Sequence, residues 1–150
     1  MKLTKLLLFG FALFAISSCS NSKTDISELI LGEWYNESMI VTIDHGKPEE
    51  SAFKVPIGSW EEVLGIKPIL TTYTEDGNYT SVYTDLSGEV SMETSGTWEV
   101  KGDSLYLTEN DITTAYKFVW MDGKGEFTGF LDWDSDGLPD DLYSGIQIKK

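Results

Sequence analysis

The chain has 150 residues, one cysteine and a formal net charge of −14, with 25 acidic residues against 11 lysines and no arginine. This length provides one domain core, and a single thiol excludes a disulfide scaffold. Such an acidic surface would repel the phosphates of nucleic acid. We therefore expect a single-domain monomer that binds no nucleic acid, and cation binding has to be argued from where the acids lie.

The first residues have the layout of a secretory signal peptide. Lys2 and Lys5 precede an apolar run from Leu6 to Ile16, and small residues follow; these are the basic, apolar and cleavage regions of such a signal. The apolar run is shorter than the about 20 residues that a membrane-spanning helix needs. We therefore predict export rather than a transmembrane anchor.

The segment Ile16-Ser17-Ser18-Cys19 resembles the lipobox of bacterial lipoproteins. The resemblance implies cleavage before Cys19 and acylation of its thiol, palmitate being one such chain, and several chains would anchor the protein stably. Ser20 implies the outer membrane of a Gram-negative bacterium, on its periplasmic or its surface side. An ordinary secretory signal with an incidental cysteine is the alternative. We expect a signal peptide over residues 1–18, a lipidated tether over residues 19–25 and a folded domain over residues 26–150.

Two short helical turns are predicted. Asp25-Ile26-Ser27-Glu28 and Ser59-Trp60-Glu61-Glu62 both have the spacing of a capping box, in which the first and fourth residues satisfy free N–H groups of the first turn. Gly32 ends the first turn. Gly65 and Pro68 end the second, which predicts a helix over residues 60–64.

From Glu33 to about Ile43 the apolar pattern has a period of two, which predicts the first strand. Trp34 lies on one face of this strand, whereas Met39 and Val41 lie on the other. This change of parity predicts a β-bulge or burial on both faces. The polar residues 46–56 that follow are expected to form a loop with at most a short edge strand.

The remaining chain consists of apolar segments joined by turn sequences. These segments are ILTTYT, YTSVYT, SGTWEV, SLYLTE, AYKFVWM, GEFTGFL and LYSGIQI, between residues 69 and 148. Asp76-Gly77 is a strong hairpin signal between the first two segments. Even spacing without a long helix predicts an all-β antiparallel meander of about eight strands. Closure into a barrel would remove the exposed sheet edges, and an open sandwich is the alternative.

Three tripeptides have the form Gly-x-Trp: Gly32-Glu33-Trp34, Gly58-Ser59-Trp60 and Gly96-Thr97-Trp98. The first follows a helical turn and begins the first strand, and this placement resembles the lipocalin family. Together with the hairpin sequences around residues 74–79 and 96–105, it is similar to the lipocalin-like domain of bacterial lipoproteins over residues 26–150. The resemblance implies a lipocalin-like barrel with Gly32 and Trp34 as structural positions. Lipocalins proper place an arginine over the first-strand tryptophan, and this chain has no arginine.

Aromatic residues are plentiful on the predicted strands. They fill small barrels whether or not a ligand is held, so a packed core is one interpretation. The other is a site for a small apolar or amphipathic ligand, with the Trp60 helix near its mouth. The residues that we predict for that site are Trp60, Tyr73, Tyr83, Trp98, Phe118 and Trp120.

The segment DWDSDGLPDD, residues 132–141, has the alternating aspartates of a calcium loop. Ca²⁺ takes six to eight oxygen ligands, and a glycine at position six allows the sharp turn. The sequence is similar to EF-hand and thrombospondin type 3 loops, but Tyr143 stands at the twelfth position, so an oxygen from another loop, such as Glu75 or Asp76, or extra water molecules would have to complete the site. An acidic hairpin turn is the alternative. The predicted ligands of a structural calcium are Asp132, Asp134, Asp136, the Leu138 carbonyl and Asp140.

The residues offer little for catalysis. His45 is the only histidine and lies beside Asp44 in a predicted turn. No nucleophile elbow, phosphate loop or zinc ligand set occurs. We therefore expect no catalytic residues, no organic cofactor and no enzyme. A protein that binds a small ligand is expected, and the alternative is an accessory lipoprotein whose solid barrel binds a protein or glycan through its surface.

Overall fold

The computed structural model describes residues 25–150, so the predicted signal peptide, Cys19 and the tether up to residue 24 lie outside the described residues. Within residues 25–150, no helix is long and apolar enough to cross a membrane. The elements, in chain order, are α1 (Ile26–Ile30), β1 (Gly32–Ile43), β2 (Ser51–Val55), α2 (Trp60–Leu64), β3 (Leu70–Tyr73), β4 (Asn78–Thr84), β5 (Val90–Lys101), β6 (Ser104–Glu109), β7 (Ile112–Trp120), β8 (Lys124–Leu131) and β9 (Asp141–Lys149).

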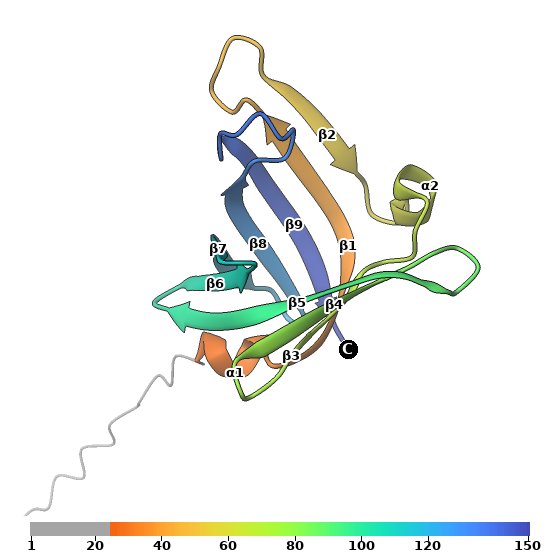
Figure 1. The fold of residues 1–150 in the computed structure, drawn as a ribbon, viewed down its shortest axis with the longest axis vertical. Helices are drawn as coiled ribbons and strands as arrows, with labels where there is room; N and C mark the ends of the chain where they lie inside the picture. Colours follow the sequence, from red (N-terminus) through yellow and green to blue (C-terminus); the bar gives the residue numbers. More distant parts are fainter. Residues whose placement is uncertain (1–24) are drawn as a thin grey trace, which may run out of the picture.

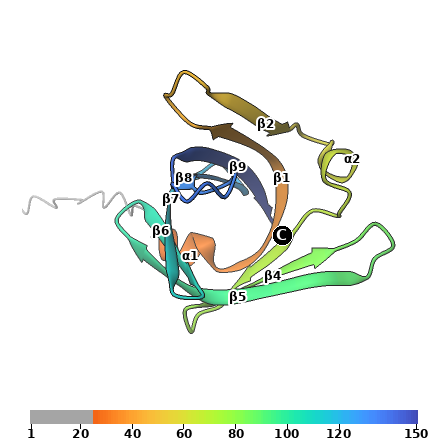
Figure 2. The same ribbon diagram turned by 45° about the horizontal axis from the view of Figure 1, so that its top comes forward.

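The strands form a closed antiparallel barrel (Figures 1 and 2). β3 to β9 pair in chain order, and β1 closes the ring by pairing with both β3 and β9. The barrel therefore has eight strands, and closure leaves none of them as a free edge. β2 pairs only with the second half of β1 and lies outside the ring. The predicted all-β meander and its closure are confirmed.

A β-bulge in β1 changes which side chains of the strand are buried. The register of β1 against β9 shifts between Asn36 and Ser38. Before the shift, Trp34 and Asn36 are buried; after it, Met39 and Val41 are buried. The extra residue reverses the parity of the side chains. Of the two alternatives that the sequence left open, a bulge or burial on both faces, the structure has the bulge.

The α1 helix closes one end of the barrel and is seen across the far end of the ring in Figure 2. The indole N–H of Trp34 donates to the Ile30 carbonyl at 2.7 Å, and both residues are fully buried. Phe118, Trp120 and Phe127 meet the Trp34 ring edge to face, with centroids 5.7–6.1 Å away. This aromatic cluster makes the closed end a solid core.

The two short helices form where the sequence predicts them, but only one is capped by a side chain. The Asp25 carboxylate accepts from the Ser27 N–H at 3.1 Å. Ser59 precedes α2 without a side-chain capping bond. The capping box predicted at Ser59 is therefore wrong, although the helix itself forms. Gly65 ends α2 in the left-handed region at φ +69°, where glycine has no steric cost.

Candidate functional site

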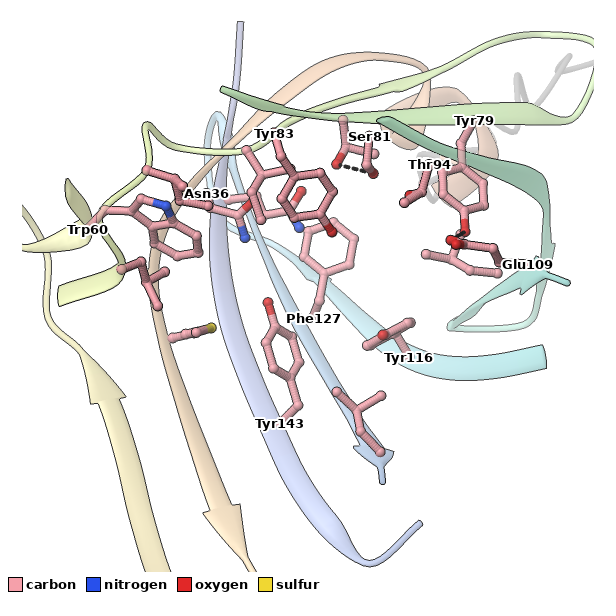
Figure 3. Close-up of a pocket in the computed structure, with 18 of the residues that line it drawn as sticks. Asn36, Trp60, Tyr79, Ser81, Tyr83, Thr94, Glu109, Tyr116, Phe127 and Tyr143 are labelled. Atoms are coloured by element: carbon pink, nitrogen blue, oxygen red, sulfur yellow. Dashed lines mark hydrogen bonds between the residues drawn. The ribbon is translucent and has the colours of Figure 1, made fainter. Parts of the chain in front are cut away.

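The open half of the barrel contains a cavity of about 410 Å³. It lies above the Trp34 cluster and opens toward α2 and the loop between β8 and β9. This volume falls within the range of small-ligand sites, about 300–1,000 Å³. Figure 3 shows side chains from α2, β1, β4, β5, β6, β7, β8 and β9 around it. The lining residues are Asn36, Met39, Trp60, Leu64, Ile66, Ile69, Thr71, Tyr73, Tyr79, Ser81, Tyr83, Thr94, Leu107, Glu109, Tyr116, Phe127, Leu131, Trp133, Tyr143 and Gln147.

Tyrosine dominates the cavity wall. Five of the seven tyrosines line it: Tyr73, Tyr79, Tyr83, Tyr116 and Tyr143. The rings of Tyr73 and Tyr79 lie 6.0 Å apart, and those of Tyr116 and Tyr143 lie 5.9 Å apart. Burial, and then the proximity of Tyr83, raises the pKa of Tyr116 to about 12. The phenols are therefore protonated at neutral pH and offer O–H donors on aromatic walls.

Two buried polar atoms of the cavity lining have no hydrogen-bond partner among the described residues. They are the indole N–H of Trp60, a residue that is only 4% exposed, and the side-chain carbonyl oxygen of Gln147. By contrast, the hydroxyls of Thr71 and Ser81 satisfy each other at 2.9 Å. A buried polar atom without a partner costs about 1–3 kcal/mol. Trp60 and Gln147 therefore leave hydrogen-bonding capacity for a polar group that enters the cavity.

Glu109 is the one charged residue among the described residues that line the cavity. It is the last residue of β6, and its Oε2 accepts from the Tyr79 hydroxyl at 3.1 Å. Burial and this bond raise the pKa of Tyr79, and burial followed by the charge of Glu109 raises the pKa of Tyr83. The carboxylate thus lies close to both phenols, as Figure 3 shows for Tyr79.

The six residues predicted for ligand binding separate into two sets. Trp60, Tyr73 and Tyr83 line the cavity. The others lie elsewhere: Trp98 meets Tyr73 edge to face and donates its indole N–H to the Thr74 carbonyl at 3.1 Å. Phe118 and Trp120 contact Trp34 at the closed end; Phe118 is buried in the core there, whereas Trp120 is 38% exposed.

Several cavity residues were not predicted as a site, including Tyr79, Glu109, Tyr116, Tyr143 and Gln147. The alternation within each strand is the signal that relates them to one another. Tyr79, Ser81 and Tyr83 share one face of β4, just as Tyr143 and Gln147 share one face of β9. Alternation does not say which of the two faces is interior, because both carry aromatic or aliphatic residues.

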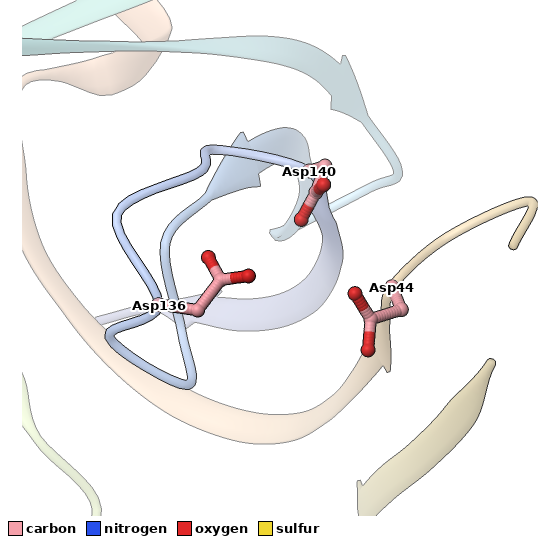
Figure 4. A group of neighbouring side chains, drawn as sticks. All are labelled: Asp44, Asp136 and Asp140. Atoms are coloured by element: carbon pink, nitrogen blue, oxygen red, sulfur yellow. The ribbon is translucent and has the colours of Figure 1, made fainter. Parts of the chain in front are cut away.

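The aspartates of residues 132–141 form two groups instead of one ring. Asp136 and Asp140 approach Asp44, which follows β1, and this group is shown in Figure 4. Asp132 and Asp134 approach Asp141. Within each group, one carboxylate oxygen per residue lies within 4.8 Å of the others. Glu75 and Asp76 lie in the β3–β4 turn, at the opposite end of the barrel, so the outside contribution to the loop comes from Asp44.

The side chains of this loop also cap its own backbone. The carboxylates of Asp132, Asp134 and Asp136 accept from the N–H groups of Gly137, Asp136 and Leu138 at 2.8–3.2 Å. Burial, and then the charges of Asp136, Asp141 and Asp44, raises the pKa of the Asp134 carboxyl. The loop therefore concentrates negative charge, and a cation would relieve it.

Asp141 is the anchor of the loop. It is fully buried, and its carboxylate accepts from the N–H groups of Asp44 at 2.9 Å, Trp133 at 2.6 Å and Asp134 at 3.2 Å. Burial opposes its ionisation, but these three donors hold the pKa of the carboxyl below its usual value of 3.8. Asp141 thus fixes the β8–β9 loop to the end of β1.

The group of Asp44, Asp136 and Asp140 fits a hard cation chemically, because Ca²⁺ prefers carboxylate oxygens. Lys47 already supplies one positive charge there. Its ammonium lies 2.8 Å from the Asp44 carboxylate and 2.7 Å from that of Asp140. These two carboxylates raise the pKa of Lys47. A metal ion at this group would therefore compete with the lysine.

Comparison with protein-family models and with curated protein sequences gave no match to this chain. The fold and the site themselves define the class. The molecule is an antiparallel eight-stranded β-barrel, closed at one end by a short helix and hollow at the other. This architecture is consistent with a lipocalin-like fold.

Proposed function

We propose that this protein binds a small amphipathic molecule inside the open half of its barrel and does not transform it chemically. The observation that carries the proposal is the aromatic cavity with the partnerless polar atoms of Trp60 and Gln147. Ligand sites combine apolar walls with a few placed polar groups. Apolar parts of the ligand would contact residues such as Met39 and Phe127, and its polar part would satisfy the free donor and acceptor.

Fluorescence titration tests this proposal, because Trp60 and Trp133 both line the cavity. Fatty acids, sterols, bile-salt-like amphiphiles and alkylammonium amphiphiles provide the ligand series. Thr94→Phe would fill the cavity and abolish binding. Glu93→Phe is the matched control, since the adjacent residue of β5 is exposed and faces outward. Absence of binding by every class, with thermal unfolding confirming a folded protein, would contradict the proposal.

We propose that Cys19 carries a lipid that anchors this barrel in the outer membrane. The lipobox-like sequence supports the proposal. Wild-type protein expressed with its full N-terminus should incorporate labelled palmitate and sediment with membranes. The Cys19→Ser variant should do neither, and membrane association of that variant would argue for an ordinary secretory signal or for another mode of attachment.

We propose that the loop of residues 132–140 holds a structural calcium. The three close carboxylates of Asp44, Asp136 and Asp140 support it. An ion that binds only the folded chain raises the melting temperature. Protein in millimolar calcium should therefore melt at a higher temperature than protein in EDTA, with magnesium as the control cation. Identical melting in all three conditions would leave the loop as an acidic turn.

A surface-binding role is the second candidate function. An apolar groove of about 730 Å³ lies outside the barrel, beside α2, and includes Ile57, Leu70, Val82 and Ile148. Ile57 is 67% exposed there. A protein or glycan partner whose binding is abolished by Ile57→Asp but unchanged by Thr94→Phe would favour this role over the interior site.

A further inference from the structure

Among the residues that the structure describes, the lining of the cavity carries a single charge, and that charge is negative. Of residues 25–150, those that line it include one carboxylate, Glu109, and no lysine or histidine. Glu109 takes part in none of the ion pairs found within residues 25–150. The neutral hydroxyl of Tyr79 donates to its carboxylate at 3.1 Å. A half-buried carboxylate without a counter-ion favours a positively charged group beside it.

The surroundings of Glu109 also suit a cation. Tyr79 contacts its carboxylate directly, and its charge acts on the phenol of Tyr83. Tyr116 also lies on the cavity wall and couples electrostatically to Tyr83. The faces of aromatic rings attract organic ammonium groups, most strongly where water is excluded. The carboxylate of an anionic ligand inside the barrel would be repelled by Glu109 and by the net charge of −14 on the chain.

We infer that the ligand of this barrel is a cationic amphiphile, with an organic ammonium beside Glu109 among Tyr79, Tyr83 and Tyr116, and an apolar body directed toward Phe127. This inference rests on the proposed interior binding and adds the charge of the ligand to it. The partnerless acceptor oxygen of Gln147 also lines the cavity and remains available to another N–H or O–H donor of the ligand. Fatty acids and other anionic amphiphiles are then poor ligands.

Dodecylammonium, dodecanol and dodecanoate test the inference, because they share one alkyl chain and differ in the charge of the head. Each is titrated below its micelle-forming concentration, and tryptophan fluorescence is the readout. We expect dodecylammonium to bind at least about tenfold more tightly than dodecanoate, as for a charge-assisted contact. Dodecanol should bind with an intermediate affinity.

Three variants test whether Glu109 causes the preference for the ammonium head over the carboxylate head. Glu109→Gln keeps the shape and removes the charge, so the tenfold preference should collapse. Glu93→Gln removes the same charge from the exposed outer face of the neighbouring strand, and the preference should persist. Tyr79→Phe removes the hydroxyl that Glu109 accepts from but keeps the carboxylate, so it should retain the preference. Thermal unfolding of each variant confirms that it is folded.

The outcomes separate the two proposals. Equal binding of the three amphiphiles, or a preference that Glu109→Gln leaves unchanged, would overturn the cationic ligand while interior binding stands. Tighter binding of dodecanoate would also overturn it. Failure of all three to bind the folded wild-type protein would overturn interior binding itself.

Discussion

The ammonium of Lys149 lies 5.7 Å from the centre of the Trp34 ring and donates to the Leu29 carbonyl at 2.7 Å. Lys149 is near the end of the last strand, and Trp34 is near the start of the first. One side chain therefore joins both ends of the folded domain to the α1 segment. It also places a cation beside the Trp34 ring in a chain that contains no arginine.

Replacing Lys149 by methionine should destabilise the barrel. The cation–π contact contributes about 0.5–2 kcal/mol, and the Leu29 carbonyl also loses its donor. Lys149→Arg should retain most of the stability. Lys150→Met is the matched control, because Lys150 is exposed and pairs with Glu33 at the surface, where ion pairs contribute little. Urea unfolding measures all three, and equal losses for Lys149→Met and Lys150→Met would contradict the expectation.

Replacing Asp141 by asparagine should destabilise the β8–β9 loop. The carboxylate accepts from three backbone N–H groups, whereas an amide offers one acceptor oxygen and turns an NH₂ group toward the remaining donors. We expect a loss of about 1–3 kcal/mol in the free energy of unfolding. Asp132→Asn is the control in the exposed part of the loop. A smaller effect at Asp141 than at Asp132 would contradict the anchoring role.

The same carboxyl predicts an acid dependence. Its pKa is lower in the folded chain than the usual value of 3.8, so its stabilising effect is present above that value and is lost as the pH falls through the folded pKa. The wild type should therefore lose stability below about pH 4 more steeply than Asp141→Asn. Urea unfolding at a series of pH values measures this, and parallel curves would exclude Asp141 as a source of the acid sensitivity.

The tyrosine-lined cavity predicts an alkaline transition. Burial raises the pKa of Tyr116 from 10.0 to about 12, and burial also raises the pKa values of Tyr73 and Tyr143. The unfolded chain loses these protons first, so stability should fall as the pH rises above about 10. Tyrosinate absorbance should increase together with unfolding. Tyr116→Phe should weaken this dependence, with Tyr106→Phe, which lies outside the cavity lining, as the control.

Removing Lys47 should strengthen calcium binding if the loop holds the ion. The ammonium occupies the space between Asp44 and Asp140, and Lys47→Met would leave those carboxylates without their counter-ion. The variant should be less stable than the wild type in EDTA and gain more from calcium, up to about 2.7 kcal/mol at a hundredfold excess over the dissociation constant. Calorimetric titration gives the affinity. Equal gains in the two proteins would contradict competition at this group.

Local sequence signals sufficed for most of the elements. Asp76-Gly77 completes the tight turn between β3 and β4, in which the Gly77 N–H donates to the Thr74 carbonyl. Gly77 lies at φ +79°, a conformation that few other residues adopt without strain. The period of two located the strands, and the parity change between Trp34 and Met39 located the bulge. These features depend on neighbours along the chain, so composition and spacing contain the information.

The candidate site depends on contacts between strands that are far apart in the sequence. Glu109 and Tyr79 come together across 30 positions, and Asp141 reaches the N–H of Asp44 across 97. No local period records such pairings, because they are set by the closure of β1 onto β9 and by the register of every strand between them.

The sequence by itself determined an all-β chain of hairpins and an acidic loop before the last strand, because backbone preferences and alternation act over a few residues. The tertiary structure decided which aromatic residues pack the closed end and which surround the cavity. It also divided the aspartates of residues 132–141 into two groups, with Lys47 between two members of one group and Asp141 buried in the other. The physical reason is that burial and electrostatic pairing depend on distance in space, which only the closed barrel fixes.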